Sequence, residues 1–409
     1  MADTSGCVIV GTGQAGFETA AALRAEGYQH PITLVGDEPH LPYQRPPLSK
    51  GFILDKQGMD EIELRPSRFF GDHRIDLLTG VRVTALDRAG KRVSLDSGED
   101  RSYDALVLAC GARNRLLPVP GANLDGVLYL RTLDESRTVK QRLQEASAIV
   151  VVGGGFIGLE IAASARSLGK SVTVLEAQPR LMPRVVAPLV SAFYATLHTG
   201  RGVTVVCDAA VAGIAGDRRA SAVTLSNGAV YPADLVIVGI GVVPNAELAR
   251  DAGLETGNGI VVDEFLQTSD PAIYAVGDCA EHPNAFCGGR ARLESVQNAA
   301  DQGRTVAATI AGKRRRYHAV PWFWTDQFDV RLQMAGLSHG YDEAVTRGNP
   351  ESQKFSVFYF RDSRLIAVDS INRPADHILA RRLLTSHAAV SPQQAADEQV
   401  NLKDLGRHA

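Results

Sequence analysis

The sequence has few cysteines, and their spacing excludes several kinds of site. The 409-residue chain contains five, an odd and scattered set without a C-x-x-C pair: Cys7, Cys110, Cys207, Cys279 and Cys287. Such a set is neither a disulfide framework nor a zinc or iron–sulfur ligand set. We therefore expect free thiols, mostly buried, no metal on this chain, and a reducing compartment, the cytoplasm.

The sequence also lacks long hydrophobic runs and an excess of charge of one sign. No window is apolar for the length of a membrane span, and the first residues lead into a strand-like run, which is unlike a signal peptide. The 43 Lys and Arg residues against 46 Asp and Glu give a net charge of -3, which argues against a dedicated nucleic-acid binder. We expect the run KRRR at 313–316 to be a solvated loop face. The length favours two to four domains.

Two segments of the chain are alike. The first, CVIVGTGQAGFETAAALRAEGYQHPITLVGDE, covers residues 7–38, and the second, AIVVVGGGFIGLEIAASARSLGKSVTVLEAQ, covers 148–178. Each has an apolar run, a glycine cluster, an alanine-rich stretch and a second apolar run that ends in an acid. This order predicts a strand, turn, helix and strand, twice.

Each segment contains the spacing G-x-G-x-x-G. The glycines are Gly11, Gly13 and Gly16 in the first segment and Gly153, Gly155 and Gly158 in the second. The first glycine allows a tight turn, the second lets the backbone approach a pyrophosphate, and the third lets the helix pack closely on the strand. The helix N-terminus then faces the phosphates with free N–H groups. Because strand, helix and terminal acid accompany each cluster, we interpret both as dinucleotide sites and not as simple turns.

The acid that ends each segment is placed to accept hydrogen bonds from ribose hydroxyls. In the first segment it is Asp37 or Glu38, and in the second it is Glu176. A carboxylate there favours a free 2′-hydroxyl and repels a 2′-phosphate. No basic residue follows Glu176 directly, and Arg180 comes four residues later. The second site is therefore expected to prefer NADH to NADPH.

The remaining sequence completes an α/β architecture with two Rossmann-like domains and a C-terminal α+β domain. Strand-plus-glycine segments at 102–121 and 231–245 suggest crossings between domains, and an apolar strand ends at Gly277-Asp278. From Trp322 onward, FSVFYF and RLIAVDSI predict antiparallel strands, ADHILARRLLTSH predicts a helix, and the last dozen residues a flexible tail. The expected domains are a first dinucleotide-binding domain at 1–114 and 246–318, a second at 115–245, and a C-terminal domain at 319–409.

Together these motifs resemble the two-dinucleotide flavoproteins that include glutathione reductase. More closely, the chain resembles the NADH-dependent ferredoxin reductases of bacterial oxygenase and cytochrome P450 systems, of the putidaredoxin reductase and biphenyl dioxygenase reductase kind. The matching stretches are GDEPHLPYQRPPLSK, LRTLDESR, GGGFIGLE, GIGVVPN, GDCAE and PWFWTDQ. The resemblance covers nearly the whole chain. One departure is Cys110, where the family usually has threonine; we expect a tolerated change and not a reactive thiol.

The proline-rich stretch LPYQRPPLSKGF, at 41–52, gains a meaning from this resemblance. Its prolines predict a stiff loop. Disulfide reductases of the superfamily keep redox cysteines just after the first dinucleotide segment, but this chain has no cysteine between Val8 and Ala109. The resemblance therefore implies hydride transfer from NADH C4 to FAD N5, followed by two one-electron transfers to an external 2Fe–2S ferredoxin. Arg45 and Lys50 in the loop are available to the flavin and its phosphates.

The resemblance also implies roles for individual residues. Lys50 is expected near flavin N5, paired with Glu160, where a cation stabilises the negative charge of reduced flavin; the alternative is a surface lysine and a helix-surface glutamate. Asp278 is expected to bind the ribityl or phosphate part of FAD, to cap a following helix, or both. Carried over by position, further FAD contacts are Ala15, Asp37, Val83, Arg131 and Val296. The expected NADH contacts are Ile157, Glu160, Glu176 and Gly241.

A docking face for the ferredoxin is a further expectation. Trp322 and Trp324, the only tryptophans, are either core residues or lie near the exposed flavin edge. Oxygenase-type ferredoxins are acidic, so nearby arginines should steer them, and Arg65 and Arg304 are the candidates. Ordinary solvated arginines are the alternative.

Other functions fit the same motifs. A rubredoxin reductase or an NADH oxidase would share the cofactors, although the missing cysteine argues against thiol-based oxidases. A flavoprotein with a binding or signalling role, similar to apoptosis-inducing factor, is a rival of a different class. The sequence does not name the cognate ferredoxin or oxygenase, and we expect a monomer because the C-terminal domain would serve the electron acceptor.

Overall fold

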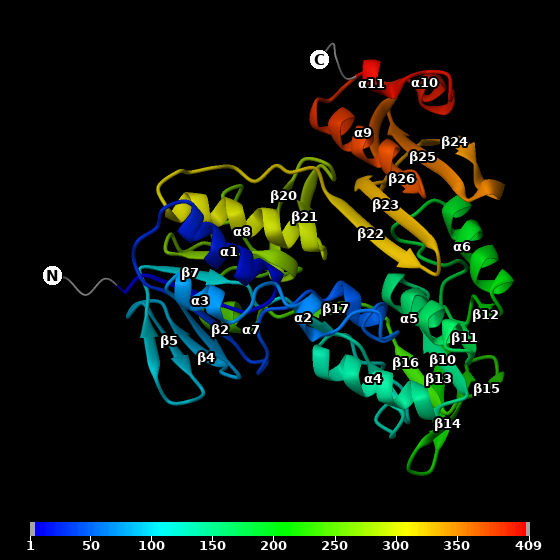
Figure 1. Cartoon of the computed structure of the whole chain (residues 1–409), viewed down its shortest axis with the longest axis horizontal. Coiled ribbons are helices and arrows are strands. Elements are labelled where there is room, and N and C mark those ends of the chain that lie inside the picture. The colour runs from blue at the N-terminus through cyan, green and yellow to red at the C-terminus, as the bar shows by residue number, and fades with distance from the viewer. Residues whose placement is uncertain (1–4, 406–409) are drawn as a thin grey trace. The chain divides into compact units, whose positions relative to one another are not determined.

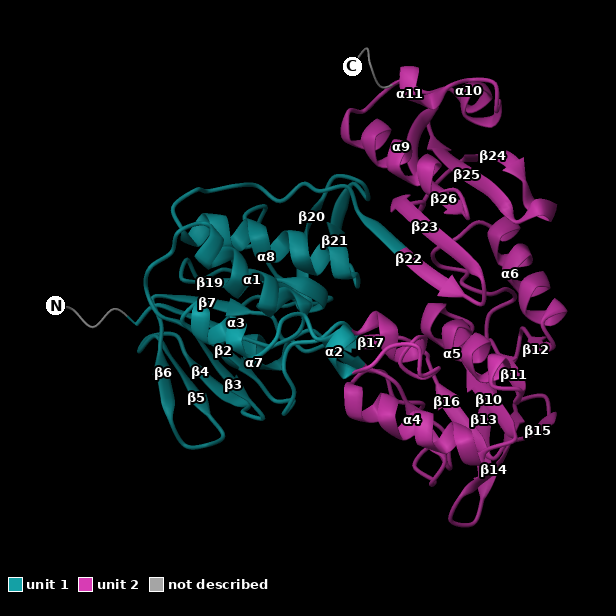
Figure 2. Ribbon diagram, in the orientation of Figure 1, with its two compact units in different colours: residues 1–44, 59–113, 243–323 teal, residues 45–58, 114–242, 324–409 magenta. Residues whose placement is uncertain are grey.

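The computed structural model describes residues 5–405, and the chain divides into two compact units (Figure 2). The first unit runs up to Gln44 and adds residues 59–113 and 243–323, and the second contains the remainder. Two of the breaks, at 113/114 and 242/243, fall within the strand-plus-glycine segments that the sequence suggested as crossings. Short strands span both breaks: β8 (Ala112–Asn114) and β17 (Val242–Pro244).

The core of the first unit is a five-stranded parallel sheet in the order β19-β7-β1-β2-β3. Its strands are β1 (Cys7–Val10), β2 (Ile32–Gly36), β3 (Ile75–Thr79), β7 (Ala105–Leu108) and β19 (Ile273–Ala275). Figure 1 labels two of these strands, β2 and β7. Helices α1 (Gln14–Ala25) and α8 (Val296–Ile310) pack side by side. The buried strand residues pair in register, Ile9 with Leu34 and Val107, so the apolar run of the first segment forms the centre of the sheet.

Smaller elements complete the first unit. β4, β5 and β6 form an antiparallel sheet, and β18, β20 and β21 form another small sheet. Their bounds are β4 (Val83–Asp87), β5 (Arg92–Leu95), β6 (Asp100–Ser102), β18 (Ile260–Val261), β20 (Ala280–Asn284) and β21 (Gly289–Ala291). The short helices are α2 (Met59–Ile62), α3 (Arg68–Asp72), α7 (Glu247–Asp251) and the 3-10 turn η2 (Gly277–Cys279).

The second unit repeats the parallel arrangement in the order β12-β11-β10-β16-β9. The strands are β9 (Val127–Tyr129), β10 (Ala148–Val152), β11 (Ser171–Leu175), β12 (Val203–Val206) and β16 (Leu235–Val238). The helices are α4 (Leu133–Glu145), α5 (Phe156–Ser167) and α6 (Pro188–Gly200). An antiparallel sheet of β13 (Val211–Gly216), β14 (Ala220–Leu225) and β15 (Val230–Pro232) follows β12. The predicted strand–turn–helix–strand order is therefore confirmed in both segments.

The C-terminal region is a five-stranded sheet with helices, as the sequence predicted. The order is β22-β23-β26-β25-β24, and β25 and β26 are the antiparallel strands expected from FSVFYF and RLIAVDSI. The strands are β22 (Trp322–Gln327), β23 (Val330–Gly336), β24 (Glu343–Asn349), β25 (Lys354–Arg361) and β26 (Arg364–Ile371). The helical elements are η3 (Pro350–Ser352), α9 (Pro374–Thr385), α10 (Pro392–Ala396) and α11 (Leu402–Leu405).

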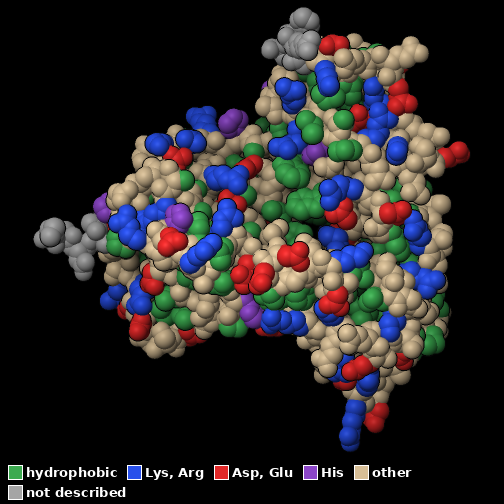
Figure 3. Space-filling view, viewed as in Figure 1, with side chains coloured by type: hydrophobic (Ala, Val, Ile, Leu, Met, Phe, Trp, Pro, Cys, Tyr) green, Lys and Arg blue, Asp and Glu red, His purple; other side chains and the backbone are tan. Residues whose placement is uncertain are grey.

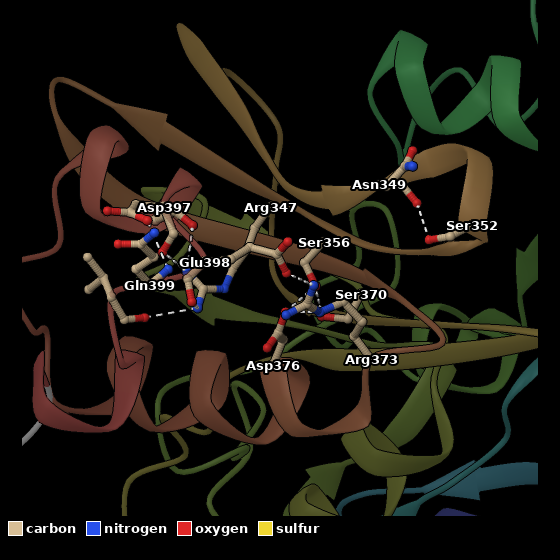
Figure 4. Close-up of polar contacts among 12 residues, drawn as sticks. Arg347, Asn349, Ser352, Ser356, Ser370, Arg373, Asp376, Asp397, Glu398 and Gln399 are labelled. Carbon is tan, nitrogen blue, oxygen red and sulfur yellow. Dashed lines mark hydrogen bonds and ion pairs between the residues drawn. The ribbon is translucent and has the colours of Figure 1, made fainter.

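The expectation of a flexible tail over the last dozen residues was wrong for the part that the structure describes, 398–405. The guanidinium of Arg347, buried in the sheet, donates a 2.9 Å hydrogen bond to the carbonyl oxygen of Val400 and also bonds the carbonyls around Asp397 (Figure 4). Leu402 in α11 is buried. The polar composition of the segment suggested that it is exposed to solvent. Instead, the guanidinium of Arg347 donates hydrogen bonds to several of its backbone carbonyls and holds it against the sheet. The last four residues lie outside the described part of the chain.

The loop at 41–52 is irregular apart from one 3-10 turn, η1 (Pro46–Ser49). Proline occupies the first turn of η1, where no backbone donor is needed. The amide of Lys50 bonds the carbonyl of Pro47 at 3.0 Å, which ends the turn at the lysine. The prolines therefore fix the backbone from which the side chain of Lys50 extends.

Among residues 5–405, the surface charges are mixed and the cysteines form no disulfide. Acidic and basic side chains are interspersed on the face shown in Figure 3, and the KRRR run is exposed, with Lys313 and Arg315 paired to Glu26. The five cysteines are free, but the expectation that most are buried was wrong, because two are buried and three are partly exposed. Within this range no group of His, Cys, Asp and Glu could hold a metal ion, and no helix is long and apolar enough to cross a membrane.

Candidate active site

The first glycine cluster joins β1 to α1, and its three glycines have different surroundings. Gly11 has φ +114, and a Cβ on it would lie 2.1 Å from the carbonyl oxygen of Ala109. A Cβ on Gly16 would lie 1.8 Å from the carbonyl oxygen of Gly11. Gly13, the N-cap of α1, would place its Cβ in open space. Protein packing thus requires the first and third glycines, and the second leaves an open N-terminus that fits a pyrophosphate.

The second cluster, between β10 and α5, repeats this pattern. A Cβ would lie 2.4 Å from the oxygen of Gly239 if placed on Gly153, and 2.1 Å from the oxygen of Gly153 if placed on Gly158. Gly155, the N-cap of α5, again has nothing within 4 Å. The side chain of Ile157, in the first turn of α5, is 44% exposed, so an apolar surface adjoins this open N-terminus. These surroundings fit a second dinucleotide.

The acids that follow the second strand of each segment differ in their burial and in their hydrogen-bond partners. Asp37 comes directly after β2, is exposed, and pairs with Arg82 at 3.2 Å, while Glu38 accepts a 2.5 Å hydrogen bond from the hydroxyl of Tyr43. Glu176 is buried. Its carboxylate accepts hydrogen bonds from the amide of Gly154 at 2.7 Å and from the amide of Gln178 at 2.8 Å. The carboxylate of Glu176 is therefore held in place beside the glycine cluster.

Arg180, the basic residue nearest after Glu176, is occupied elsewhere. Its guanidinium donates hydrogen bonds to the carbonyl oxygens of Val186 at 2.8 Å and Pro183 at 2.7 Å, and to the hydroxyl of Ser191 at 2.6 Å. These bonds fix the loop before α6. They leave the negative charge of Glu176 uncompensated by Arg180, which fits a nucleotide without a 2′-phosphate.

Lys50 and Glu160 form an ion pair, so the alternative of two unrelated surface residues is wrong. The Nζ of Lys50 lies 2.8 Å from Oε1 of Glu160, whose side chain is 3% exposed, against 20% for Lys50. Glu160 belongs to α5, and the hydroxyl of Ser164, one turn later on the same helix, donates a 2.8 Å hydrogen bond to the carbonyl of Ser49. The helix of the second cluster thus holds the end of the proline-rich loop at two points.

Arg45, at the start of η1, donates a 2.6 Å hydrogen bond to the carbonyl oxygen of Arg131. The amide of Arg131 in turn donates to the carboxylate of Glu135 at 2.6 Å, next to the capping box at the start of α4. The structure therefore brings Arg45 and Arg131 together. Gly241, at φ +99 after β16, accepts a 3.0 Å backbone bond from the amide of Arg115.

The expectation that Asp278 caps a following helix was wrong. Asp278 lies in η2, and strand β20 follows it at once. The next helix, α8, begins at Val296 and is capped by the side chain of Ser295. The strand pattern before Asp278 was visible in the sequence, but the hairpin of β20 and β21 between it and the helix was not. The N-terminus of α8, with the positive end of its helix dipole, therefore does not lie at Asp278.

A buried network supports the backbone at Asp278 instead. Gly277 has φ +77, and its amide donates a 2.7 Å hydrogen bond to Oε1 of Gln302 in α8. The Nε2 of Gln302 lies 3.2 Å from Nδ1 of His282. Burial lowers the pKa of His282 to about 4, so its ring stays neutral and accepts this bond. Sequence reasoning did not identify Gln302 or His282.

The remaining predicted FAD contacts lie in the first unit. Ala15 is buried in α1, and a Cβ on Gly277 would lie 2.9 Å from its methyl group. Val83 begins β4 and is half-buried, and Val296 begins α8. The thiol of Cys110 contacts the carbonyl of Val10, and desolvation raises its pKa well above the usual value, so it is a poor nucleophile at neutral pH.

The predicted docking residues are at least partly exposed. Trp322 and Trp324 are half-buried in β22, which is less burial than a core position would give. Arg65 is exposed, and its guanidinium lies 5.7 Å from the ring centroid of Phe69. Arg304 pairs with Glu18 at 3.0 Å and with Asp301 at 3.3 Å. Arg65 is therefore the less neutralised of the two arginines.

Two hydroxyl residues on Glu160 were missed by sequence reasoning. Ser49 donates to Oε2 of Glu160 at 2.5 Å, and Thr325 donates to Oε1 at 2.7 Å. Ser49 directly precedes Lys50 in the loop. Thr325 lies in PWFWTDQ, where the alternation of a strand turns it to the face opposite Trp324. That alternation was the available signal.

Comparison with known proteins places the chain in a family. The model described as Pyridine nucleotide-disulphide oxidoreductase matches residues 5–303, and the model described as Reductase C-terminal matches residues 322–406. The chain belongs to this oxidoreductase family. It is 50% identical to rhodocoxin reductase of Rhodococcus erythropolis over 98% of this chain and 94% of that protein.

Solved structures of the family agree with the fold. A ferredoxin reductase for the CYP199A2 system from Rhodopseudomonas palustris is 46% identical, with a TM-score of 0.96 over 99% of this chain and 100% of that one. A covalent putidaredoxin reductase–putidaredoxin complex matches at 43% identity, with a TM-score of 0.95 over 98% of this chain and 97% of that one. The chain is thus a glutathione reductase-like flavoprotein oxidoreductase, which uses FAD and NAD(H), and the predicted resemblance is confirmed.

Proposed function

We propose that the chain is an NADH:ferredoxin oxidoreductase that passes electrons from NADH through FAD to a 2Fe–2S ferredoxin serving a cytochrome P450 or a dioxygenase. The observation that carries the proposal is the Lys50–Glu160 pair on the helix of the second glycine cluster, in a chain without cysteine between Val8 and Ala109. Such a chain offers no internal thiol to receive electrons, so they leave to an outside carrier. The named relatives, reductases of ferredoxin-type partners, support this acceptor.

Bound FAD supplies the hydride acceptor and the conversion to one-electron chemistry, so the protein needs no nucleophile or metal of its own. Lys50 supplies a cation where negative charge develops on reduction, and Glu160 fixes the position of that cation. Both residues are assigned as catalytic. Lys50 is the more exposed member of the pair, and the side chain of Glu160 is almost fully buried.

The FAD site is assigned to the first glycine cluster and to the further residues that the family resemblance implies. The open N-terminus at Gly13 binds the pyrophosphate, and Asp37 accepts from the ribose. The other proposed contacts are Gly11, Ala15, Gly16, Arg45, Lys50, Val83, Arg131, Asp278 and Val296. The FAD-binding domain is proposed as 1–114 with 246–318.

The NADH site is assigned to the second cluster. The proposed contacts are Gly153, Gly155, Ile157, Gly158, Glu160, Glu176 and Gly241. Glu176, held by backbone amides, accepts from both ribose hydroxyls and disfavours NADPH. The NAD-binding domain is proposed as 115–245, and the C-terminal domain as 319–409.

The acceptor is proposed to dock near Trp322, Trp324, Arg65 and Arg304. Aromatic side chains and arginine are typical of interface anchors, and an acidic partner would be attracted by Arg65 most strongly, because Arg304 already pairs with two acids. We also propose a monomer in the cytoplasm, since the C-terminal domain serves the acceptor and all five cysteines are free.

Stopped-flow absorbance on the purified holoprotein tests the function. The protein is mixed with NADH or NADPH, with and without a 2Fe–2S ferredoxin encoded in the same genome, and with a rubredoxin as the alternative acceptor. We expect rapid bleaching by NADH, slow bleaching by NADPH, and rapid ferredoxin reduction afterwards.

The outcomes separate the parts of the proposal. Bleaching by NADH without reduction of any ferredoxin would remove the proposed acceptor, and fast rubredoxin reduction would replace it. Rapid consumption of oxygen by the reduced protein would favour an oxidase. A stable complex with NAD and slow turnover with every acceptor would favour a signalling role.

A further inference from the structure

The carboxylate of Glu160 collects three donors, of which only Lys50 belongs to the ion pair. Thr325 Oγ1 and Lys50 Nζ share Oε1, at 2.7 and 2.8 Å, while Ser49 takes Oε2. Lys50 and Ser49 come from one loop, but Thr325 comes from β22, in sequence 165 residues away from Glu160. Both oxygens of Glu160 therefore have donors, and these donors come from two separate elements, the proline-rich loop and β22.

Thr325 does not end the chain of polar contacts. Gln327, two residues later on β22, lies with its Nε2 3.4 Å from Oγ1 of Thr325. Its Oε1 lies 2.9 Å from Nε2 of His198 in α6. Thr325, Gln327 and His198 are all fully buried. A continuous series of hydrogen bonds thus runs from α6 through β22 to the acid that holds Lys50.

The chemistry of the groups fixes the direction of these bonds. An ionised carboxylate only accepts, so Thr325 spends its single hydroxyl hydrogen on Glu160 and must accept from the amide of Gln327. The carbonyl of Gln327 then faces His198, which must donate from Nε2. Burial lowers the pKa of His198, and its Nδ1 has no hydrogen-bond partner among the described residues, so the neutral ring carries its hydrogen on Nε2. Every donor in the series points toward Glu160.

β22 presents two faces with different contents. Thr325 and Gln327 are buried, whereas Trp324 and Asp326 alternate with them on a partly exposed face. A strand is stiff over four residues, so the position of the buried hydroxyl is coupled to the position of the neighbouring tryptophan. One strand therefore carries both the support of Glu160 and a proposed docking residue.

We propose that Thr325 is a positioning residue for the Lys50–Glu160 pair, with Gln327 and His198 holding Thr325 in place. The inference rests on the proposed function of that pair and adds a role to β22. Without the hydroxyl, Oε1 of Glu160 loses its second donor, and the carboxylate is held only by Lys50 and Ser49 of the loop, with no donor from β22. Lys50 then loses its fixed place, which weakens stabilisation of charge in the transition state more than binding of NADH.

The test measures flavin reduction by NADH in the holoprotein by stopped flow. Thr325→Val keeps the shape but removes the donor. We expect its limiting reduction rate to fall by about tenfold, while the NADH concentration giving half this rate changes by less than about twofold. Thr325→Ser retains the hydroxyl and should restore the rate to within about threefold. Thr325→Ala removes the same donor without added bulk and serves if the valine variant does not fold.

A double-mutant cycle tests the supporting chain. Gln327→Leu should slow reduction by a smaller factor, and the double variant with Thr325→Val should be no slower than Thr325→Val alone, because both act through one hydroxyl. Ser356→Ala, which removes another buried hydroxyl bond of the same region, to Asp376 at 2.9 Å, is the matched control and should leave the rate unchanged.

Three results would overturn the inference: an unchanged rate in Thr325→Val, failure of Thr325→Ser to restore the rate, or multiplicative effects in the cycle. Because only reduction by NADH is measured, these results are independent of the acceptor. Failure of the proposed function shows instead as wild-type protein that NADH does not reduce, or that reduces no ferredoxin.

Discussion

At the scale of single residues, the second glycine of each cluster is distinguished by having no packing reason to be glycine. Gly155 has ordinary extended backbone angles and faces open space, while Gly158 lies against the backbone of its own turn. The absence of a side chain at Gly155 therefore matters only when a ligand occupies that space.

Gly155→Ala should consequently separate binding from stability. We expect the NADH concentration for half-maximal rate to rise by at least about tenfold. The free energy of unfolding should change by less than about 1 kcal/mol, as for an N-cap exchange. Gly158→Ala is the contrast and should unfold or fail to accumulate, because its Cβ would meet a carbonyl oxygen at 2.1 Å. Equal loss of stability in both variants would contradict the assignment.

Glu176 is the proposed determinant of the choice between nucleotides. Glu176→Gln removes the charge but keeps the size, so we expect kcat/KM for NADH to fall by about tenfold or more, since hydrogen bonds to a charged group are worth about 1.5–3 kcal/mol. The ratio of NADPH to NADH activity should rise, because the repulsion of a 2′-phosphate is lost. Glu145→Gln, at the exposed end of α4, is the control with the same charge change. A ratio that stays constant would remove Glu176 from specificity.

At the scale of elements, β25 and β26 form a buried pair of strands that also contains an acid. Asp369 in β26 is buried and accepts a 2.5 Å hydrogen bond from the hydroxyl of Tyr359 in β25. The Tyr359 oxygen also accepts from the amide of Ala187, before α6. Burial raises the pKa of Asp369 from 3.8 to about 7, although the tyrosine opposes the shift.

This acid predicts a dependence of stability on pH. The unfolded carboxyl loses its proton near pH 3.8 and the folded one near pH 7, so the unfolded state binds fewer protons between these values. Stability from this group therefore falls as pH rises across that window. The stability of Asp369→Asn relative to wild type should rise by about 1–3 kcal/mol between pH 5 and pH 8.

Thermal unfolding of both proteins from pH 5 to 8 checks this expectation. The difference between variant and wild type isolates Asp369, because buried His282 and His377, whose pKa values burial lowers to about 4, contribute equally to both proteins. Asp329→Asn, an exposed carboxylate, is the control and should give a pH-independent difference. A variant less stable at pH 8 than at pH 5, relative to wild type, would contradict the assigned sign.

The C-terminal segment depends on one side chain of β24. Arg347→Met should release the carbonyls around Val400, and we expect a loss of about 2–3 kcal/mol, typical of hydrogen bonds to a charged donor. Limited proteolysis should cut first after residue 396. Arg382→Met, an exposed arginine of α9, is the control. An unchanged cleavage pattern would show that the packing of Leu402 and the Arg373–Glu398 ion pair hold the segment without Arg347.

At the scale of the whole molecule, the net charge of -3 is spread over interspersed charges, so long-range attraction of an acidic partner depends on a few local arginines. Arg65→Glu should lower the second-order rate of ferredoxin reduction by about three- to tenfold at low salt and flatten its salt dependence. Arg304→Glu should have a smaller effect, because its acids already neutralise it.

Arg250→Glu on α7 makes the same charge change at another exposed position of the first unit and should leave the rate unchanged. An equal effect of all three variants would indicate response to net charge and not to a docking face. The reduction of flavin by NADH should be unaffected in each variant, which separates docking from chemistry.

The sequence by itself determined the parts of this protein that depend on local pattern. Apolar runs, glycine spacing and terminal acids lie within about thirty residues of each other, so both strand–turn–helix–strand units and the strands β25 and β26 were predictable from them. Side chains repeat every 2 residues along a strand and every 3.6 residues along a helix, so contacts within a single turn or a single βαβ unit can be predicted from the sequence.

Tertiary structure alone decided the contacts between distant segments. Thr325 reaches Glu160 across 165 residues, and nothing in the period of either element states that they meet. The same holds for Gln302 below η2, for the raised pKa of Asp369, and for the C-terminal carbonyls gathered by Arg347. Buried polar groups must find partners, but which partner each one finds depends on the packing of whole elements, and only the folded chain specifies that packing.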